Sequence, residues 1–343
     1  MKKEPLFGKN IDELTGITQK LNLPKFTAKQ IAGWLYQKKV SSFEQMTNIS
    51  KKTRKLLKEN FDIGFYPPVS VQKSKDGTKK YLFQTQNNSF IESAYIPESK
   101  RNTLCISSQA GCKMNCSFCA TGKQGFQENL TVTDILNQIV SIPESDKLTN
   151  LVYMGMGEPL DNLNEVLKSL EILTSEWGFG WSNRKITLST IGIIPALQKF
   201  LDTSKVHLAV SLHTPFDDER TQLMPANKAY PIKDIIELLK THPFDRHRRL
   251  SFEYIVFGGI NDTSKHVKEL ARLLNGLKCR INLIRFHTIP GSDLKSTDEK
   301  RLTAFKDALN AKGITTTIRA SRGQDIDAAC GLLSTKELLK QHS

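Results

Sequence analysis

Long apolar runs are missing from this sequence of 343 residues. No run approaches the roughly 20 apolar residues that a membrane-spanning helix needs. The first ten residues, MKKEPLFGKN, also lack the apolar core of a secretory signal peptide. Low-complexity segments and short internal repeats are likewise missing. We therefore expect a globular protein of the cytoplasm with no membrane partner.

Cysteine is also scarce, yet four of the six cysteines fall within fifteen residues, in the stretch CISSQAGCKMNCSFCATG that begins at Cys105. The other two, Cys279 and Cys330, lie far along the chain. In a cytoplasmic chain of this length such a set does not indicate a disulfide framework, and metal binding or catalysis is the better interpretation. Cys279 stands alone beside RINLI and is expected to be a small buried apolar residue.

Acidic residues are outnumbered: 49 Lys and Arg face 35 Asp and Glu, for a formal net charge of +14. The first sixty residues hold 13 basic and 5 acidic side chains, so more than half of the excess lies there. The densest basic clusters are KKTRKLLK (51–58) and RHRR (246–249). A basic surface attracts polyanions, so the charge favours nucleic acid as a partner over a merely solvated surface.

The order of β-prone and helical segments predicts an α/β fold. Short β-type runs alternate with amphipathic helical patterns from about residue 100 onward, which indicates a parallel sheet. The number of units fits a full or partial barrel better than an open sheet, although order alone leaves a doubly wound fold open. In either fold the active site lies at the carboxyl ends of the strands. The runs span 103–107, 150–155, 185–190, 206–212, 250–257, 281–286 and 314–320.

Two further segments precede this core. Residues 1–62 have a helical pattern and predict a small helical domain with a basic exterior suited to nucleic acid; the family resemblance described below implies that this nucleic acid is RNA. The stretch YLFQTQNNSFIESAYI has two β-prone runs around an Asn-Asn turn, which predicts a linking β-hairpin within residues 63–97. The core then spans residues 98–332, and residues 333–343 form a C-terminal tail.

Cys112, Cys116 and Cys119 form the pattern C-x3-C-x2-C just after the first strand of the predicted core. Three thiolates on one tight loop favour a soft metal, so zinc and iron–sulfur are the candidates. A structural zinc site needs four closed ligands, and no fourth Cys or His stands at finger-like spacing. Three ligands on a cubane cluster would leave one iron open to a substrate.

With Phe118 as the aromatic residue before the last cysteine, this motif resembles that of the radical S-adenosylmethionine (SAM) enzymes. The resemblance implies a partial (βα)6 TIM-type barrel. It implies that Cys112, Cys116 and Cys119 hold a 4Fe–4S cluster whose fourth iron is chelated by the methionine end of SAM. An electron then splits SAM into methionine and a 5′-deoxyadenosyl radical.

Five motifs narrow the resemblance: CISSQAGC, MGMGEPLDN, LSTIGIIPAL, SLHTP and DIDAACG. Their order and number, over residues 90–332, are similar to those of the RlmN family of adenosine C2 methyltransferases. The resemblance implies two substrates, an adenine in the peptidyl-transferase region of 23S rRNA and the adenine 3′ of the anticodon in tRNA. It also implies an electron donor such as flavodoxin or ferredoxin and a monomeric enzyme.

The resemblance also assigns a set of SAM contacts at the ends of the predicted strands. Gly157 and Glu158 in MGMGEP would hold the amino group of the SAM methionine. His287 stands where relatives more commonly have Asn, and both side chains can donate and accept a hydrogen bond. The ribose and adenine of SAM would contact Ser189, Ser211, Leu212, His213 and His287.

Three residues outside the cluster motif take catalytic roles by the same resemblance. The Cys330 thiolate would accept a methyl group from one SAM, and a second SAM would supply the radical that activates this group for addition to C2. Glu92 would remove the C2 proton from the resulting protein–RNA adduct. Cys105 would then attack the Cys330 sulfur and release the RNA, leaving a transient disulfide. This route suits C2, an electron-poor ring carbon that cannot attack a SAM methyl group.

Three alternatives stay open on the sequence. One is the related resistance-type enzyme that methylates C8 of the same rRNA adenine, although Ala110 and Pro159 differ from its motifs. Another is a radical SAM enzyme that acts on a protein or small molecule. The last is a non-catalytic RNA-binding protein with a structural iron–sulfur or zinc site.

Overall fold

A computed structural model describes residues 3–329 and 331–333, so Cys330 lies outside the described residues. Within these ranges no helix is both long and apolar enough to cross a membrane. The strands are β1 (Glu4–Pro5), β2 (Phe61–Asp62), β3 (Ser70–Lys73), β4 (Lys79–Gln84), β5 (Phe90–Glu98), β6 (Arg101–Ile106), β7 (Gln109–Ala110), β8 (Glu128–Asn129), β9 (Asn150–Tyr153), β10 (Ile186–Thr190), β11 (His207–Ser211), β12 (Leu250–Val256), β13 (Cys279–Arg285) and β14 (Thr316–Ile318). The α-helices are α1 (Ile11–Lys20), α2 (Thr27–Ala32), α3 (Lys51–Asn60), α4 (Ala120–Gln124), α5 (Val132–Val140), α6 (Leu163–Thr174), α7 (Ile194–Thr203), α8 (Asp217–Leu223), α9 (Ile232–Lys240), α10 (Ser264–Leu273) and α11 (Glu299–Ala311).

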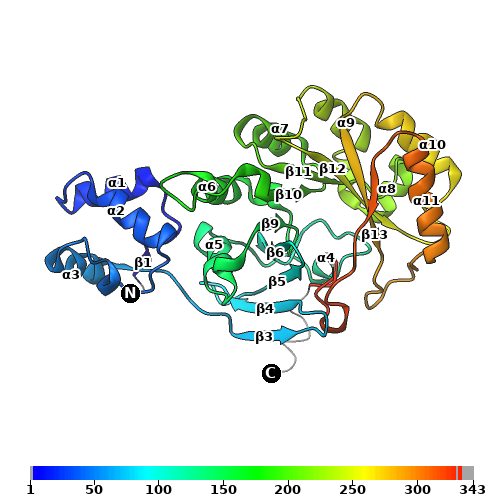
Figure 1. Cartoon of the computed structure of the whole chain (residues 1–343). Helices are drawn as coiled ribbons and strands as arrows, with labels where there is room; N and C mark the ends of the chain where they lie inside the picture. The colour runs from blue at the N-terminus through cyan, green and yellow to red at the C-terminus, as the bar shows by residue number, and fades with distance from the viewer. Residues whose placement is uncertain (1–2, 330, 334–343) are drawn as a thin grey trace.

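One ten-stranded sheet organises the chain, in the order β14-β13-β12-β11-β10-β9-β6-β5-β4-β3. Seven of its strands pair in parallel, and each of the seven β-type runs in the sequence supplies one of them: β6, β9, β10, β11, β12, β13 and β14. The short strands β7 and β8 pair with each other in a separate antiparallel sheet. The sheet ends at β14 and β3 without closing. The predicted α/β class with a partial barrel is therefore confirmed, and helices cover its outer face (Figure 1).

Polar side chains reach the interior of this barrel beside apolar ones, which period-2 alternation explains. On β12, Phe252 and Tyr254 point outward into the apolar core under the helices. Ser251, which precedes them, and Glu253, which lies between them, point the other way and line an internal cavity. A barrel filled with apolar side chains would be a packed core, whereas this one retains space for ligands.

The predicted hairpin is present as β4 and β5, with β3 added to form an antiparallel meander. It does not stand apart as a linker, because β5 pairs directly with β6 and extends the barrel sheet. Ala94 of β5 lies opposite Cys105 of β6. The hairpin thus contributes a wall to the same interior face.

The N-terminal helices α1, α2 and α3 gather beside α6, away from α8, α10 and α11 (Figure 1). A capping box at Asn10 and Glu13 starts α1. Lys168 of α6 pairs with Glu13 at 2.6 Å, and the ring of Tyr36 packs against Trp177 at 6.0 Å between centroids. Because Tyr36 is fully buried in the same hydrophobic core as the barrel residues, removal of this unit would expose apolar surface.

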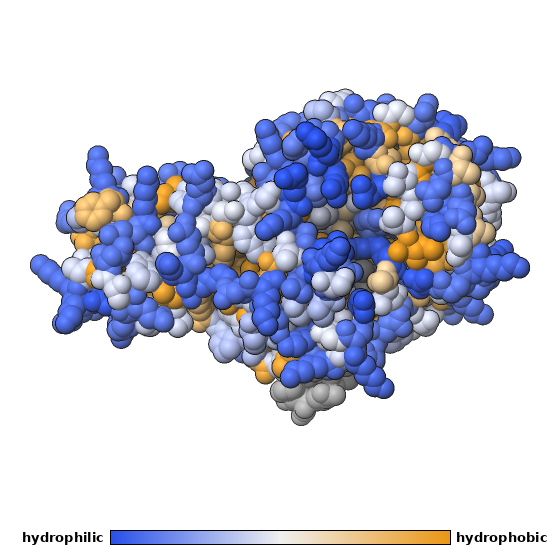
Figure 2. Space-filling model, viewed as in Figure 1, coloured by the Kyte–Doolittle hydropathy of each residue, from blue (hydrophilic) through white to orange (hydrophobic). Residues whose placement is uncertain are grey.

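The two basic clusters differ in their surroundings. Hydrophilic side chains cover most of the N-terminal helices on the face shown in Figure 2, and Lys51, Lys52 and Lys55 of α3 are exposed. In RHRR, by contrast, Arg248 is partly buried, donates to the Leu201 carbonyl at 2.8 Å and lies over the Phe200 ring. RHRR also precedes β12, at the end of the barrel opposite the cysteine motif. Of the four RHRR residues, Arg248 alone is turned inward, whereas Lys51, Lys52 and Lys55 of α3 are all exposed.

Candidate active site

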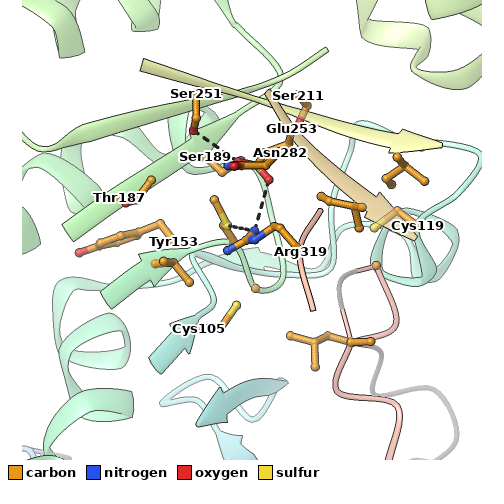
Figure 3. A pocket seen from close by; sticks show the side chains of 18 of the residues that line it. Cys105, Cys119, Tyr153, Thr187, Ser189, Ser211, Ser251, Glu253, Asn282 and Arg319 are labelled. Atoms are coloured by element: carbon orange, nitrogen blue, oxygen red, sulfur yellow. Dashed lines mark hydrogen bonds and ion pairs between the residues drawn. The ribbon is translucent and has the colours of Figure 1, made fainter. Parts of the chain in front are cut away.

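A cavity of about 690 Å³ runs through the barrel and reaches the loops that follow the strands. Figure 3 shows Cys105 and Cys119 at this cavity together with polar side chains from β10, β11, β12 and β13. Ten of the predicted site residues line it: Cys105, Cys112, Cys116, Cys119, Gly157, Glu158, Ser189, Ser211, His213 and His287. Segments nearly 200 residues apart in the sequence thus meet at one site. Two other predicted residues, Glu92 and Leu212, do not line the cavity.

The three-cysteine loop leaves β6 through a turn that only glycine allows. Gly111 has φ +73°, and a Cβ there would lie 1.7 Å from the Gly125 carbonyl oxygen. The Cys112 amide donates to that same carbonyl at 3.1 Å, and the Cys119 amide donates to the Cys116 carbonyl at 3.2 Å. The backbone therefore holds all three thiols at the cavity.

The thiols lie in a site that disfavours charge in the absence of a cation. Burial raises the pKa of Cys112 to about 12 and raises the pKa of Cys116 well above its ordinary value, and in both cases the other cysteines add to the shift. A positively charged metal centre would stabilise the thiolates.

The donor set fits an iron–sulfur cluster better than a single zinc ion. Among the described residues, no three Cys, His, Asp or Glu side chains converge closely enough to hold one metal ion. A 4Fe–4S cluster binds each thiolate through a different iron, so its three sulfur ligands stand farther apart than the ligands of one zinc ion. Three thiols at one cavity, without a fourth ligand, match that requirement.

The GMGE segment after β9 lies close against the end of β6. Gly157 has φ +96°, and a Cβ there would stand 2.5 Å from the Gln109 Cβ. The Glu158 amide donates to the Gln109 side-chain oxygen at 2.8 Å, and the Met156 amide donates to Ser107 Oγ at 2.8 Å. Glycine is needed here so that the two strand ends can approach.

Glu158 is 4% exposed and points between β9 and β10. Its carboxylate accepts hydrogen bonds from Thr190 Oγ1 at 2.6 Å, the Ile191 amide at 2.9 Å and the Leu160 amide at 3.0 Å. Burial raises its pKa to about 7, although these three donors act in the opposite direction. The residue is rigidly held, lines the cavity and can accept from an amino group there.

Of the residues predicted to contact the nucleoside part of SAM, Ser189 and Ser211 line the cavity from β10 and β11. Leu212 follows directly, but its side chain is fully buried in the apolar core. Its amide donates to the Glu253 carbonyl and its own carbonyl accepts from Thr214. The geometry therefore gives no support to a SAM contact by Leu212.

His213 has a left-handed backbone (φ +58°) and a buried ring. The Ile255 amide donates to its Nδ1 at 3.0 Å, so the neutral ring carries its proton on Nε2. Burial, aided by Arg220, lowers its pKa to about 3 and keeps it neutral. The ring packs edge-on against Phe118 of the cysteine loop, with 4.7 Å between centroids. A neutral His213 thus joins the end of β11 to that loop.

His287 follows β13 and also lines the cavity. Its Nε2 lies 3.0 Å from the Ser321 hydroxyl, and burial lowers its pKa, with Arg285 adding to the effect. A neutral imidazole can exchange donor and acceptor roles as an Asn amide can. The substitution at this position is therefore compatible with a hydrogen-bonding role.

Cys105 on β6 forms a small buried cluster with Ala94 and Ala328. Glu92 lies two residues before Ala94 on β5, so it shares the interior face with Cys105. It is fully buried and pairs with Lys80 Nζ at 3.2 Å. Cys112, Cys116, Cys119 and Cys279 are free thiols. The disulfide that the resemblance implies has no support in the structure, because its second partner, Cys330, lies outside the described residues.

Cys330 is outside the described residues, but both of its flanks are anchored. Asp325 accepts from the Ser74 hydroxyl at 2.6 Å, and Asp76 accepts from the Gly323 amide at 2.9 Å, which ties the preceding segment to the β3–β4 turn. The Gly331 carbonyl accepts from the Ala120 amide at 2.8 Å, at the start of α4. Ala329 and Gly331 line the cavity.

Four cavity residues were not predicted from the sequence. Glu253 accepts from Asn282 at 2.8 Å and pairs with Arg319 at 3.3 Å, and Arg319 also reaches the Met154 sulfur at 3.4 Å (Figure 3). They lie on four different strands or strand ends, so no local motif joins them. The one available signal was period-2 alternation, which places a polar residue at every second position of these strands.

Comparison with known proteins agrees with this site. Residues 106–274 match the radical SAM superfamily. A crystal structure of a radical SAM methyltransferase from Sphaerobacter thermophilus superimposes with a TM-score of 0.90 at 37% identity, over 96% of this chain and 99% of that one. The fold and the site thus define a radical SAM methyltransferase.

The particular family follows from the whole chain. Residues 5–63 match the ribosomal RNA large subunit methyltransferase N-terminal domain. The "Probable dual-specificity RNA methyltransferase RlmN" of Bacteroides fragilis is 57% identical over 98% of this chain and 97% of its own length. The "Dual-specificity RNA methyltransferase RlmN" of Desulfotalea psychrophila is 43% identical over 96% and 94%. The chain belongs to the RlmN family of radical SAM RNA methyltransferases.

Proposed function

We propose that this chain methylates carbon 2 of adenosine in 23S rRNA, in the peptidyl-transferase region, and in tRNA, 3′ of the anticodon. One observation carries the proposal. Cys105 and the anchored flanks of Cys330 meet the three-cysteine loop at a single cavity. A methyltransferase that used SAM by simple displacement would need neither the loop nor the additional pair of cysteines.

The residues that line this cavity would bind two cofactors, a 4Fe–4S cluster and SAM. Cys112, Cys116 and Cys119 would ligate a 4Fe–4S cluster. Gly157 and Glu158 would hold the methionine end of SAM, and Ser189, Ser211, His213 and His287 its nucleoside. Cluster and SAM, when bound, supply a radical that can remove a hydrogen atom from an unreactive carbon. This is the chemistry that an electron-poor ring carbon requires.

The chain's own side chains would divide the remaining work. The Cys330 thiolate takes a methyl group from one SAM by displacement, with a second SAM consumed in each turnover. The carbon on the Cys330 sulfur then becomes bonded to C2 of the adenine, and Glu92 accepts the C2 proton. Cys105 attacks the Cys330 sulfur, frees the methylated RNA and leaves a disulfide that a cytoplasmic reductant removes.

RNA binding would divide between two parts of the chain. The core (98–332) would take an unstacked adenine into the cavity. The N-terminal unit (1–62) would hold phosphates with α3, while residues 63–97 join the two. The tail expected at residues 333–343 lies outside the described residues from position 334 onward. Because both RNAs are cytoplasmic, we place the enzyme there. We expect it to act as a monomer with flavodoxin or ferredoxin as electron donor.

Nucleoside mass spectrometry tests this function. Purified anaerobically and supplied with SAM, a reductant and unmodified rRNA or tRNA, the protein should yield 2-methyladenosine in both RNAs. 8-Methyladenosine would instead identify the related resistance-type activity. Cleavage of SAM without any methylated nucleoside would show that the substrate is not RNA, and the absence of SAM cleavage would leave only an RNA-binding role.

A further inference from the structure

Lys80 and Glu92 form a buried ion pair on the strand face that carries Cys105, although neither residue lines the cavity. Lys80 Nζ lies 3.2 Å from Glu92 Oε1, and the two side chains are 8% and 0% exposed. In the part of the chain that the structure describes, this is the one ion pair in which both side chains are less than one-tenth exposed. In each of the other ion pairs between described residues, at least one side chain is one-tenth exposed or more.

Such a pair is costly unless both members are present. Moving a carboxylate or an ammonium out of water costs several kcal/mol, and only a close partner of opposite charge offsets it. Loss of one partner leaves the other charge buried and uncompensated, so a carboxylate in that position takes up a proton instead. Lys80 is therefore a cation placed to offset the buried charge of Glu92.

The register of the sheet brings this pair to the reactive cysteine. Ala94 of β5 lies opposite Lys80 of β4 on one side and opposite Cys105 of β6 on the other. Glu92, two residues away, shares the face of Ala94, so Lys80, Glu92 and Cys105 occupy one interior surface. Ala328 packs onto Ala94 and Cys105 and closes this surface from above.

Lys79, the neighbour of Lys80 in the sequence, points to the other face. It pairs with Glu144, which also accepts from the Tyr81 hydroxyl. The two lysines thus have the same chemistry and adjacent positions, but only Lys80 reaches the face that carries Cys105. Lys79 is therefore a matched control.

We propose that Lys80 is a positioning residue for proton removal from C2: its ammonium holds the Glu92 side chain as an ionised carboxylate on the Cys105 side of the sheet. This inference rests on the proposed role of Glu92. In that step the C2–H bond breaks, the proton passes to a Glu92 oxygen, and the bonding electron pair stays in the adenine ring. A protonated Glu92 could not accept the proton, so the protein–RNA adduct would persist.

The test compares Lys80→Met, Lys80→Arg, Lys79→Met and Glu92→Gln in the full-length, iron-loaded protein. Denaturing electrophoresis measures the adduct and its decay, while iron content and SAM cleavage report on the rest of the site. Lys80→Met should bind iron and cleave SAM as the wild type does, yet slow adduct decay by roughly 10²-fold, the scale of a lost general base. Lys80→Arg should restore most of the decay rate, and Lys79→Met should leave it unchanged.

Each outcome decides between the two claims. If Glu92→Gln accumulates the adduct but Lys80→Met releases RNA at the wild-type rate, the Lys80 inference is wrong and the role of Glu92 stands. If Glu92→Gln itself releases RNA normally, the proposed role of Glu92 fails, and that of Lys80 with it. If Lys80→Met and Lys80→Arg both lose iron or SAM cleavage, Lys80 is a structural residue and the inference is overturned.

Discussion

The protonation of a single carboxyl, Glu158, controls how the cavity receives an amino group. Burial raises its pKa to about 7, so near neutral pH a large part of the unliganded protein carries the neutral acid. If Glu158 holds the SAM amino group as proposed, its ionised form would accept hydrogen bonds from that group, whereas the neutral acid would do so poorly. We predict that SAM affinity rises as the pH rises through about 7 and then levels off.

Calorimetric titration of the iron-loaded protein with SAM measures this dependence. Below the pKa, affinity should fall by up to roughly tenfold per pH unit, and Glu158→Gln should flatten the profile. The same shift affects folding. Between pH 4.5, the ordinary pKa, and about pH 7, the folded protein binds a proton on Glu158 that the unfolded chain releases. The contribution of Glu158 to the free energy of unfolding therefore falls as the pH rises from about 4.5 to about 7. A wild-type profile equal to that of Glu158→Gln would exclude the amino-group role.

Gly157 is a second residue at which the local backbone requires glycine. Its φ is positive, and a Cβ at this position would lie 2.5 Å from the Gln109 side chain, so both features oppose any larger residue. Gly157→Ala should lower the free energy of unfolding by roughly 2–4 kcal/mol and impair SAM cleavage. Gly180 also has a positive φ but has no atom within 4 Å of a Cβ, so Gly180→Ala should cost only roughly 1–2 kcal/mol. Chemical denaturation measures both, and equal losses would contradict the close-approach argument.

At the scale of elements, the loop between β6 and α4 is the part of the chain proposed to hold the iron–sulfur cluster. Cys112→Ala, Cys116→Ala and Cys119→Ala should each abolish iron binding and methylation, because a cubane held by two thiolates is not retained. Cys279 begins β13 on the periphery of the core, so Cys279→Ala should keep its iron. The measurements are iron content and visible absorbance after anaerobic reconstitution, and a triple Cys112/Cys116/Cys119 variant with wild-type iron would refute the ligand assignment.

The elements also show what sequence patterns can predict. Each of the seven parallel strands and the β4–β5 hairpin was predictable, because apolar period and turn residues are local signals. The thiol loop and Glu158 were predictable because their motifs are contiguous. Lys80 and Arg319 were not, since each acquires its role from a partner on another strand. In RHRR, Arg248 turns inward while Arg246, His247 and Arg249 stay exposed, a difference that charge alone could not indicate.

At the scale of the whole molecule, the N-terminal unit is basic yet packs into the common core. Its role is therefore best tested by changing its surface rather than by deleting it. Lys51 and Lys52 on α3 are exposed, and neither makes an ion pair with a described residue. Neutralising both, as Lys51→Gln with Lys52→Gln, should weaken RNA binding and reduce the magnitude of the slope of log K against log salt by roughly 1.4 to 1.8.

Lys300 and Lys312 offer a matched control, because both are exposed on or beside α11, on the opposite side of the molecule (Figure 1). Their substitution by Gln changes the net charge equally and should leave the slope nearly unchanged. Filter binding at several salt concentrations, with tRNA and with an rRNA fragment, gives the slopes. Equal effects of the two double variants would mean that total charge, not α3, attracts the RNA.

The central claim is that this cavity joins the protein covalently to RNA and releases it through a second cysteine. Denaturing electrophoresis after reaction with RNA, SAM and reductant tests it most directly in Cys105→Ala, Cys330→Ala and the double variant. The account predicts a slow-migrating, nuclease-sensitive band for Cys105→Ala alone, because methyl transfer and addition proceed and only release fails. Without Cys330 there is no methyl carrier, so neither the single Cys330 variant nor the double variant should form the band. Normal product from Cys105→Ala, or an adduct from Cys330→Ala, would contradict the account.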